Sequence, residues 1–313
     1  AGEPTGFVAS FKNGTGPVIA ILAEFDALPG LSQAAHPTKQ PVPGQDNGHG
    51  CGHNLFGAAS VAGAVALKSW MIQNKVQGEI RVYGTPAEEG GSGKVYMVRD
   101  GLFDDVDVTL HWHPGNVNSA NQGTSMANIS GKFRFYGQSS HASGAPWAGR
   151  SALDGVEIMN VSTNYLREHI PDRTRIHYVV TNGGKAPNVV PDFAEVYYYV
   201  RNADPKIVVD VMGRVKKAAD GAAMASGTRV EFEQTGGVYN LLPNDVLGKV
   251  MQSSLESVGG ITWTAEETKF AQELAKSLPK GGGDLSSVGK IQPYKDADTS
   301  GDAGGGSTDV ADI

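Results

Sequence analysis

The first third of the chain alternates strand-sized apolar runs with polar, glycine-rich loops. Residues 17–25 predict a buried strand that leads into the acidic loop EFDALPG. The Ala-rich segment 55–74 predicts a helix, with Asn54 as its N-cap residue. Two further strands are expected over GEIRVYGTP and VDVTLHWHP. This order of elements predicts an α/β sheet with its ligand-binding loops along one edge.

The middle of the chain follows a different pattern, β-α-β-β-α-β, which is the ferredoxin-like order. Its apolar positions place Phe133, Phe135, Val196, Tyr198 and Val200 on strands. We therefore predict an inserted α+β domain over residues 123–237, and an interrupted α/β domain formed by residues 1–122 and 238–313. The last part is expected to hold two helices and a polar, glycine-rich tail from residue 301.

Composition narrows the classes of function. Of the 313 residues, 40% are hydrophobic and 19% are charged, which predicts a packed core. The formal net charge of −7 argues against nucleic acid as a partner, because phosphate binding needs a basic face. No run of about eighteen apolar residues occurs, so no membrane partner is expected. Cys51 is the single cysteine, which excludes an intrachain disulfide and fits a reducing, cytoplasmic location.

Cys51 and His53 stand one residue apart in a glycine-rich turn at the start of the predicted helix. An extended turn can direct two such side chains the same way. A helix N-terminus favours a thiolate, which is the form that binds metal. The alternative is a buried structural cysteine beside a histidine that caps the helix.

Two further pairs follow predicted strands. Glu88 and Glu89 would need a positive partner if buried, and a metal would supply it; the alternative is a solvated acidic turn. His111 and His113 share a face of the third strand, although a histidine there is often a plain surface residue. Cys, His and carboxylate ligands together suit zinc or manganese. Asp26 is a natural partner for a ligand imidazole, unless it is a simple turn acid before a proline.

The motifs EFDALPG, GHGCGHN, GTPAEEGG and HWHPG, in this order, resemble the metal-dependent aminoacylase and carboxypeptidase superfamily. The chain is most similar to the amidohydrolase branch, in which Cys replaces a bridging Asp. The resemblance implies a metallopeptidase-type α/β catalytic domain with an inserted ferredoxin-like lid and dimerisation domain. It also implies two divalent metal ions, Zn²⁺ or Mn²⁺, as cofactors.

The resemblance implies a role for each matching residue in the α/β domain. Cys51 would bridge the two metals and His53 would bind one of them. Glu88 would act as general base and acid, and Glu89 would be a ligand. His113 matches the next ligand best because it directly precedes Pro114, with His111 as the second candidate.

Three residues of the inserted domain also match the family. His141 would reach the partner's active site and stabilise the oxyanion, whereas Asn188 and Arg201 would hold the substrate's carboxylate. Arg suits that task because its planar guanidinium meets a carboxylate bidentately. The alternatives are a surface salt bridge for Arg201 and a turn residue for Asn188.

The sequence departs from the family pattern in two places. Glu24 stands where many relatives have a metal-binding His, although the amidohydrolase branch commonly has an acid there. The family's last His ligand, expected after the STDV segment, has no counterpart, since no His follows His177. The chain also begins without Met or a leader-like segment, and the family's first strand and helix have no counterpart. The resemblance therefore implies a fragment truncated at both ends, with at most one tight metal and little activity by itself.

The function that the resemblance implies is hydrolysis of an amide bond in an N-acyl amino acid. The expected substrate is p-aminobenzoyl-glutamate or a related folate breakdown product. One alternative is a dipeptidase or an N-acyl-amino-acid hydrolase of other specificity. Another is an inactive subunit that completes a partner's site, and a third is a carboxylate-binding module without catalysis. A homodimer or heterodimer through the lid domain is expected.

Overall fold

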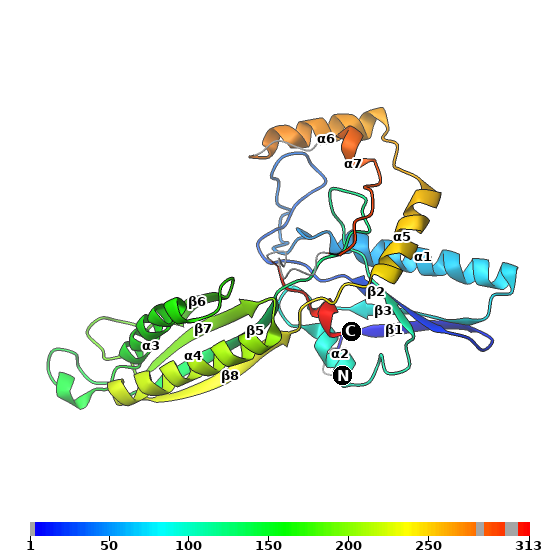
Figure 1. Cartoon of the computed structure of the whole chain (residues 1–313). Helices are drawn as coiled ribbons and strands as arrows, with labels where there is room; N and C mark the ends of the chain where they lie inside the picture. Colours follow the sequence, from blue (N-terminus) through cyan, green and yellow to red (C-terminus); the bar gives the residue numbers. More distant parts are fainter. Residues whose placement is uncertain (1–3, 280–284, 298–305) are drawn as a thin grey trace. The chain divides into compact units, whose positions relative to one another are not determined.

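The computed structural model describes residues 4–279, 285–297 and 306–313 (Figure 1). These residues form two compact units. The first takes its residues from the ranges Ala1–Gly123, Leu242–Thr299 and Asp312–Ile313. The second takes its residues from Thr124–Leu241 and Ser300–Ala311. Part of the predicted polar tail, residues 301–305, lies outside the described residues.

The first unit contains a four-stranded sheet in the order β1-β3-β2-β4. Its strands are β1 (Phe7–Asn13), β2 (Val18–Glu24), β3 (Gly78–Thr85) and β4 (Val108–Leu110). β2 is parallel to β3 and β4, whereas β1 pairs antiparallel with β3 at the edge. β1 was not expected from the sequence, because its side chains are largely exposed and form no buried run. β4 has three residues and is shorter than predicted.

Two helices connect the parallel strands. α1 (His53–Asn74) runs between β2 and β3, and α2 (Gly93–Arg99) runs between β3 and β4. The N-cap of α1 is Gly52, so the prediction that Asn54 caps this helix was wrong. Three more helices of this unit follow later in the chain: α5 (Asp245–Val258), α6 (Ala265–Ser277) and α7 (Leu285–Val288). A 3₁₀ turn, η3, covers Asp309–Asp312.

The parallel pairing of β2, β3 and β4 brings their C-terminal ends to one edge of the sheet. The segment after β2 carries Asp26, the segment after β3 carries the two glutamates, and the segment after β4 carries the two histidines. The N-terminus of α1 opens at the same edge because the helix returns the chain from β2 to β3. The fold therefore gathers polar side chains from four segments that are far apart in the sequence.

α1 is also the one helix in the described part of the chain that is long and apolar enough for a membrane span. It packs against β2 and β3 on one side. Its other side exposes Leu55, Val61, Val65, Trp70 and Ile72. A helix that lies on a sheet can pass the same test of length and composition, so the absence of a membrane partner stays a prediction.

The second unit has the β-α-β-β-α-β order that the sequence predicts. Its elements are β5 (Ala127–Tyr136), α3 (Ala152–Leu166), β6 (Arg175–Asn182), β7 (Phe193–Asn202), α4 (Pro205–Ser226) and β8 (Arg229–Val238), with short 3₁₀ turns at η1 (Pro146–Ala148) and η2 (Arg167–His169). The strands form an antiparallel sheet in the order β6-β7-β5-β8. This order confirms the ferredoxin-like prediction and hence the combined α/β and α+β fold class.

Both long helices of the second unit lie on one face of its sheet (Figure 1). Alternate residues of β7 are buried, so every second side chain faces these helices. The core includes the five predicted strand residues, Phe133, Phe135, Val196, Tyr198 and Val200. Ser151 caps α3 and Asp204 caps α4, which fixes where each helix begins. The second unit therefore has a core of its own.

Candidate metal centre

His53 is one of the most buried side chains of the polar cluster at the sheet edge, with 1% of its surface exposed. Its Nδ1 lies 2.8 Å from Asp26 Oδ1, and Asp26 Oδ2 accepts a hydrogen bond of 2.9 Å from the backbone N–H of Glu89. The carboxylate therefore holds the imidazole with Nδ1–H toward Asp26. This leaves Nε2 as the free lone pair, which is the arrangement typical of a metal-binding histidine.

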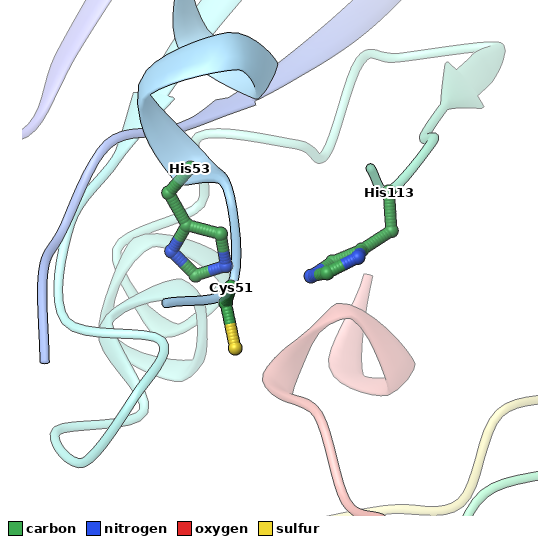
Figure 2. Close-up of side chains that lie close together, drawn as sticks. All are labelled: Cys51, His53 and His113. Atoms are coloured by element: carbon green, nitrogen blue, oxygen red, sulfur yellow. The ribbon is translucent and has the colours of Figure 1, made fainter. Parts of the chain in front are cut away.

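Cys51, His53 and His113 come together around one small space (Figure 2). One ligand atom from each lies within 4.8 Å of the other two. The ring centroids of His53 and His113 are 5.5 Å apart. Nδ1 of His113 lies 2.8 Å from the carbonyl oxygen of Pro114, which favours a proton on Nδ1 and leaves Nε2 for a ligand.

Gly52 makes this convergence possible because its backbone is in the left-handed region, with φ 78°. The turn at this residue separates Cys51 from His53, which is the first residue of α1. A Cβ atom on Gly52 would lie 2.9 Å from Cβ of Pro114, the residue after His113. The backbone of this turn thus lies directly against the segment that carries His113.

The two glutamates lie beside the same cluster. Glu89 Oε1 is 4.0 Å from His53 Nε2, and its carboxylate accepts a hydrogen bond from the Cys51 thiol. Glu88 belongs to a second group, with Glu24 and His53, whose ligand atoms also lie within 4.8 Å of one another. The structure therefore brings together all four predicted ligands, with Glu88 adjacent.

Glu24 is buried at the centre of this second group, with 1% of its surface exposed. Its Oε1 lies 2.7 Å from Nζ of Lys94, whose side chain is 0% exposed, and its Oε2 lies 3.2 Å from His53 Nε2. Burial raises the pKa of this carboxyl, but His111 and Lys94 outweigh it and lower the pKa to about 2. Lys94 was missed in the sequence; an acid at the end of a buried strand was the signal that a cation had to face it.

His111 occupies a different position from His113. Its Nε2 lies 3.7 Å from Glu24 Oε1, and its ring packs at 5.2 Å from the buried Phe56 ring. The group formed with Cys51 and His53 includes His113 and not His111. The geometry thus favours His113, the first choice of the two, as the ligand.

The thiol of Cys51 differs from the sequence-based expectation. Its pKa is raised from 9.0 to about 11, first by the hydrogen bond to Glu89 and then by burial and by the charges of Glu89, Glu88 and Asp26. The helix N-terminus therefore does not produce a thiolate in the metal-free protein, and that expectation was wrong. A cation among these groups would lower the pKa of the thiol, because it would attract both the carboxylates and a thiolate.

The donor set fits a metal ion. It offers one sulfur, two imidazole nitrogens and carboxylate oxygens, the set that suits zinc. His53 Nε2 is buried and, among the described residues, has no partner in hydrogen-bonding geometry. A buried polar atom of this kind is costly unless something binds it. A metal at this position would satisfy it.

The three candidate residues of the second unit fall into two places. The backbone N–H of Ala142 donates to the carbonyl of Asn188, and His141 pairs with Val189, so His141 and Asn188 lie side by side. His141 Nδ1 accepts from the N–H groups of Ser143 and Gly144, which leaves its Nε2 to carry a proton. Arg201 lies near the other end of β7, eight residues beyond Phe193, or about 26 Å along an extended strand. One chain therefore does not bring Arg201 to His141 and Asn188.

The sequence matches the family model described as Peptidase family M20/M25/M40 over residues 20–280. The chain belongs to this peptidase family. Over 279 residues it is 46% identical to one of the subunits of p-aminobenzoyl-glutamate hydrolase of Escherichia coli (strain K12), a match that covers 88% of this chain and 57% of that protein. It is 31% identical to Xaa-Arg dipeptidase of Mus musculus, over 93% of this chain and 64% of that protein. The chain thus spans less than two thirds of each of these M20-family relatives.

A solved structure shares the fold of this family member. It is that of an aminobenzoyl-glutamate utilization protein from Klebsiella pneumoniae, with a TM-score of 0.61 and 20% sequence identity. The match covers 98% of this chain and 65% of that one. At this identity the likeness shows the fold, including both units.

We predict that Glu89→Gln increases the rate at which Cys51 is alkylated in metal-free buffer at pH 8. The hydrogen bond to Glu89 is the largest cause of the raised thiol pKa, so its loss should lower that pKa and increase the thiolate fraction. The rate should rise at least about tenfold. Iodoacetamide labelling across pH 7 to 11 measures it, with Glu79→Gln on β3 as the control. Equal rates in the two variants would contradict the contact with Glu89.

We predict that Gly52→Ala destabilises the first unit and weakens metal binding. The left-handed backbone costs about 1–2 kcal/mol for a residue with a Cβ, and the new Cβ would press on Pro114. Urea unfolding in EDTA and a zinc titration measure the two effects. Gly63→Ala in α1 is the matched control, because a Cβ there meets nothing within 4 Å. That control should stabilise the helix by about 0.5–1 kcal/mol.

Proposed function

We propose that this protein is a metal-dependent amidohydrolase that cleaves the amide bond of an N-acyl amino acid. The observation that carries the proposal is the convergence of Cys51, His53, Glu89 and His113 beside Glu88. Family membership and the names of the relatives support amide-bond hydrolysis. The Escherichia coli relative, named as a p-aminobenzoyl-glutamate hydrolase, supports p-aminobenzoyl-glutamate, or a related folate breakdown product, as the substrate.

Two divalent ions, Zn²⁺ or Mn²⁺, are the proposed cofactors. Cys51, His53, Glu89 and His113 would hold them. When bound, such ions lower the pKa of a water and polarise the substrate carbonyl. Asp26 keeps the His53 imidazole oriented through Nδ1, so that Nε2 faces the ligand position.

The protein's own side chains carry out the remaining steps. Glu88 takes the proton from the attacking water and passes it to the leaving amine, as a general base and then an acid. His141 can donate its Nε2–H to the oxyanion, because its Nδ1 already accepts two backbone N–H groups. Asn188 and Arg201 hold the substrate's carboxylate.

We infer that two chains cooperate, as a homodimer or heterodimer through the lid domain. Asn188 precedes β7, whereas Arg201 lies near the far end of that strand. This supports two chains, since both residues can contact one small substrate only if different lids supply them. β6 is an edge strand with exposed Val179 and Val180. A relative named as a subunit supports an assembly of more than one chain. A cytoplasmic location is proposed from the single free cysteine.

The relative named Xaa-Arg dipeptidase favours a second candidate, a dipeptidase. Release of free amine should be measured from p-aminobenzoyl-glutamate, N-acetylglutamate and Xaa-Arg dipeptides, with Zn²⁺ or Mn²⁺, in the longest expressed form of the protein. We expect p-aminobenzoyl-glutamate to be cleaved fastest and EDTA to stop the reaction. Faster cleavage of the dipeptides would support the dipeptidase. Stoichiometric metal without hydrolysis of any substrate would show an inactive subunit and contradict the proposal.

A further inference from the structure

One end of the lid sheet carries positive side chains on the face that α3 and α4 do not cover. Arg201 of β7 lies directly opposite Arg175 of β6. The next pair on this face is Tyr199 of β7 opposite His177 of β6. Directly paired residues of neighbouring strands point to the same face. Val200, between Tyr199 and Arg201, points to the helices and is buried, so Arg175, His177 and Arg201 share the outer face.

This arrangement is unfavourable in the absence of an anion. Like charges directly opposite each other destabilise a sheet. The acids of this face lie toward the other end, where Glu195 pairs with Arg134 at 2.7 Å and Glu231 pairs with Arg229. The pKa of His177 is lowered, first by burial and then by the charges of Arg201, Arg167 and Arg175. At the other end, therefore, glutamates balance the arginines, whereas Arg175 and Arg201 lie opposite each other.

The contacts of the two arginines leave donors available. Arg201 Nη1 donates to Ser307 Oγ at 3.1 Å, and its guanidinium lies 5.2 Å from the centroid of the Tyr199 ring. Arg201 Nε is buried and has no hydrogen-bond partner among the described residues. Arg175 Nη1 donates to the carbonyl of Thr174 at 3.3 Å, and the side chain is exposed. A buried guanidinium donor without a partner is the kind of group that an anionic ligand satisfies.

Hydroxyl groups extend the same face. Ser130 Oγ lies 3.0 Å from Thr235 Oγ1, which donates to the Tyr197 hydroxyl at 3.0 Å. The Tyr197 hydroxyl donates in turn to the Tyr199 hydroxyl at 3.3 Å. Tyr199 therefore keeps its own proton for a further acceptor. The chain of hydroxyls holds this donor beside the two arginines.

We propose that Arg175, His177 and Arg201 form a subsite for the two carboxylates of a dicarboxylic amino acid, such as the glutamyl part of an N-acyl glutamate. The identity of the substrate rests on the proposed function, whereas the subsite rests on the lid alone. Each guanidinium pairs with one carboxylate bidentately, which one arginine could not do for both. Directly opposite strand residues are about 5 Å apart at Cβ, a spacing that suits the short link between the carboxylates of glutamate. His177 and the Tyr199 hydroxyl add donors.

The binding experiment uses the metal-free chain in EDTA, so that the first unit contributes no metal-bound anion. Glutarate, glutaramate and inorganic phosphate are titrated by calorimetry into the wild type, Arg175→Gln, Arg175→Lys and Arg229→Gln. Glutarate should bind about tenfold more tightly than glutaramate, and Arg175→Gln should remove that preference. Arg175→Lys should restore part of it. Arg229→Gln, at the other end of the same face, should leave it unchanged. Equal binding of glutarate, glutaramate and phosphate would overturn the subsite, as would an unchanged preference in Arg175→Gln.

A kinetic experiment separates this inference from the proposed function. In the longest expressed form, N-acyl glutamate and N-acyl glutamine are compared in the wild type and in Arg175→Gln. The variant should raise KM for the glutamate substrate about tenfold and leave KM for the glutamine substrate unchanged. Hydrolysis with an unchanged ratio of the two KM values would overturn the subsite alone. Absence of hydrolysis would count against the proposed function, while the glutarate titration would still decide the subsite.

Discussion

Glu88→Gln is expected to lower kcat by about 10²–10⁴-fold while the bound metal stays the same. The amide of Gln has nearly the same shape as the carboxylate but cannot accept a proton from water. Glu88 lies next to the predicted ligands without belonging to the Cys51, His53 and His113 group. Its loss should therefore remove proton transfer and leave metal binding. Steady-state kinetics and metal content of the longest expressed form measure the two quantities.

Glu89→Gln is the matched control for this prediction. Glu89 lies 4.0 Å from His53 Nε2 and contacts the Cys51 thiol, so its variant should lose metal together with turnover. The structure also places Glu88 with Glu24 and His53 in a group that could hold a metal. Loss of metal in Glu88→Gln would therefore show that Glu88 is a ligand and contradict its role as the base.

Lys94→Met is expected to destabilise the fold by about 3–5 kcal/mol, because it leaves a buried charge without its partner. Glu24 and Lys94 are 1% and 0% exposed, and their charged atoms lie 2.7 Å apart. Methionine has a similar length and keeps the apolar packing of α2. Urea unfolding in EDTA at pH 7 measures the loss. The double variant Glu24→Gln with Lys94→Met should recover much of the stability, because the buried charge is then gone.

The stability of Lys94→Met should depend on pH in a different way from that of the wild type. In the wild type the folded pKa of Glu24 is about 2, below its ordinary value of 4.5. The carboxylate therefore contributes stability that is present above pH 4.5 and is lost as the pH falls toward 2. Without Lys94 this pKa should rise, because His111 is then the one group that opposes the effect of burial. Protonation then relieves the penalty as the pH falls. The stability difference between the two proteins should shrink from pH 7 to pH 4, and a constant difference would contradict the role of Lys94.

The ligands at the sheet edge could be predicted from the sequence because they follow strands. Parallel strands end at one edge, so residues after β2, β3 and β4 meet whatever the detailed packing. The same reasoning explains why Asp26 could be assigned to an imidazole before any distance was known. The burial of Lys94 could not be predicted, since it depends on how α2 lies against Glu24. The raised pKa of Cys51 likewise depends on the position of Glu89, which no spacing in the sequence gives.

In the second unit, too, some features could be predicted from the sequence and others could not. Alternating apolar residues on β5 and β7 predicted their buried face, because a strand has a period of two. Sequence motifs assigned Asn188 and Arg201 to the same substrate carboxylate. Asn188 precedes β7, however, and Arg201 lies near the far end of that strand. The pairing of Arg175 with Arg201 could not be predicted either, since it depends on the antiparallel register of β6 and β7.

The proposed chemistry depends on a metal ion held by Cys51, His53, Glu89 and His113. X-ray absorption spectroscopy of the chain loaded with one equivalent of Zn²⁺ measures the kinds of ligand atom and their distances from the metal. We expect one sulfur at about 2.3 Å and nitrogen or oxygen neighbours at about 2.0–2.1 Å. Cys51→Ser should remove the sulfur and keep the light-atom shell. A wild-type spectrum with nitrogen and oxygen neighbours alone would show that this metal centre does not form.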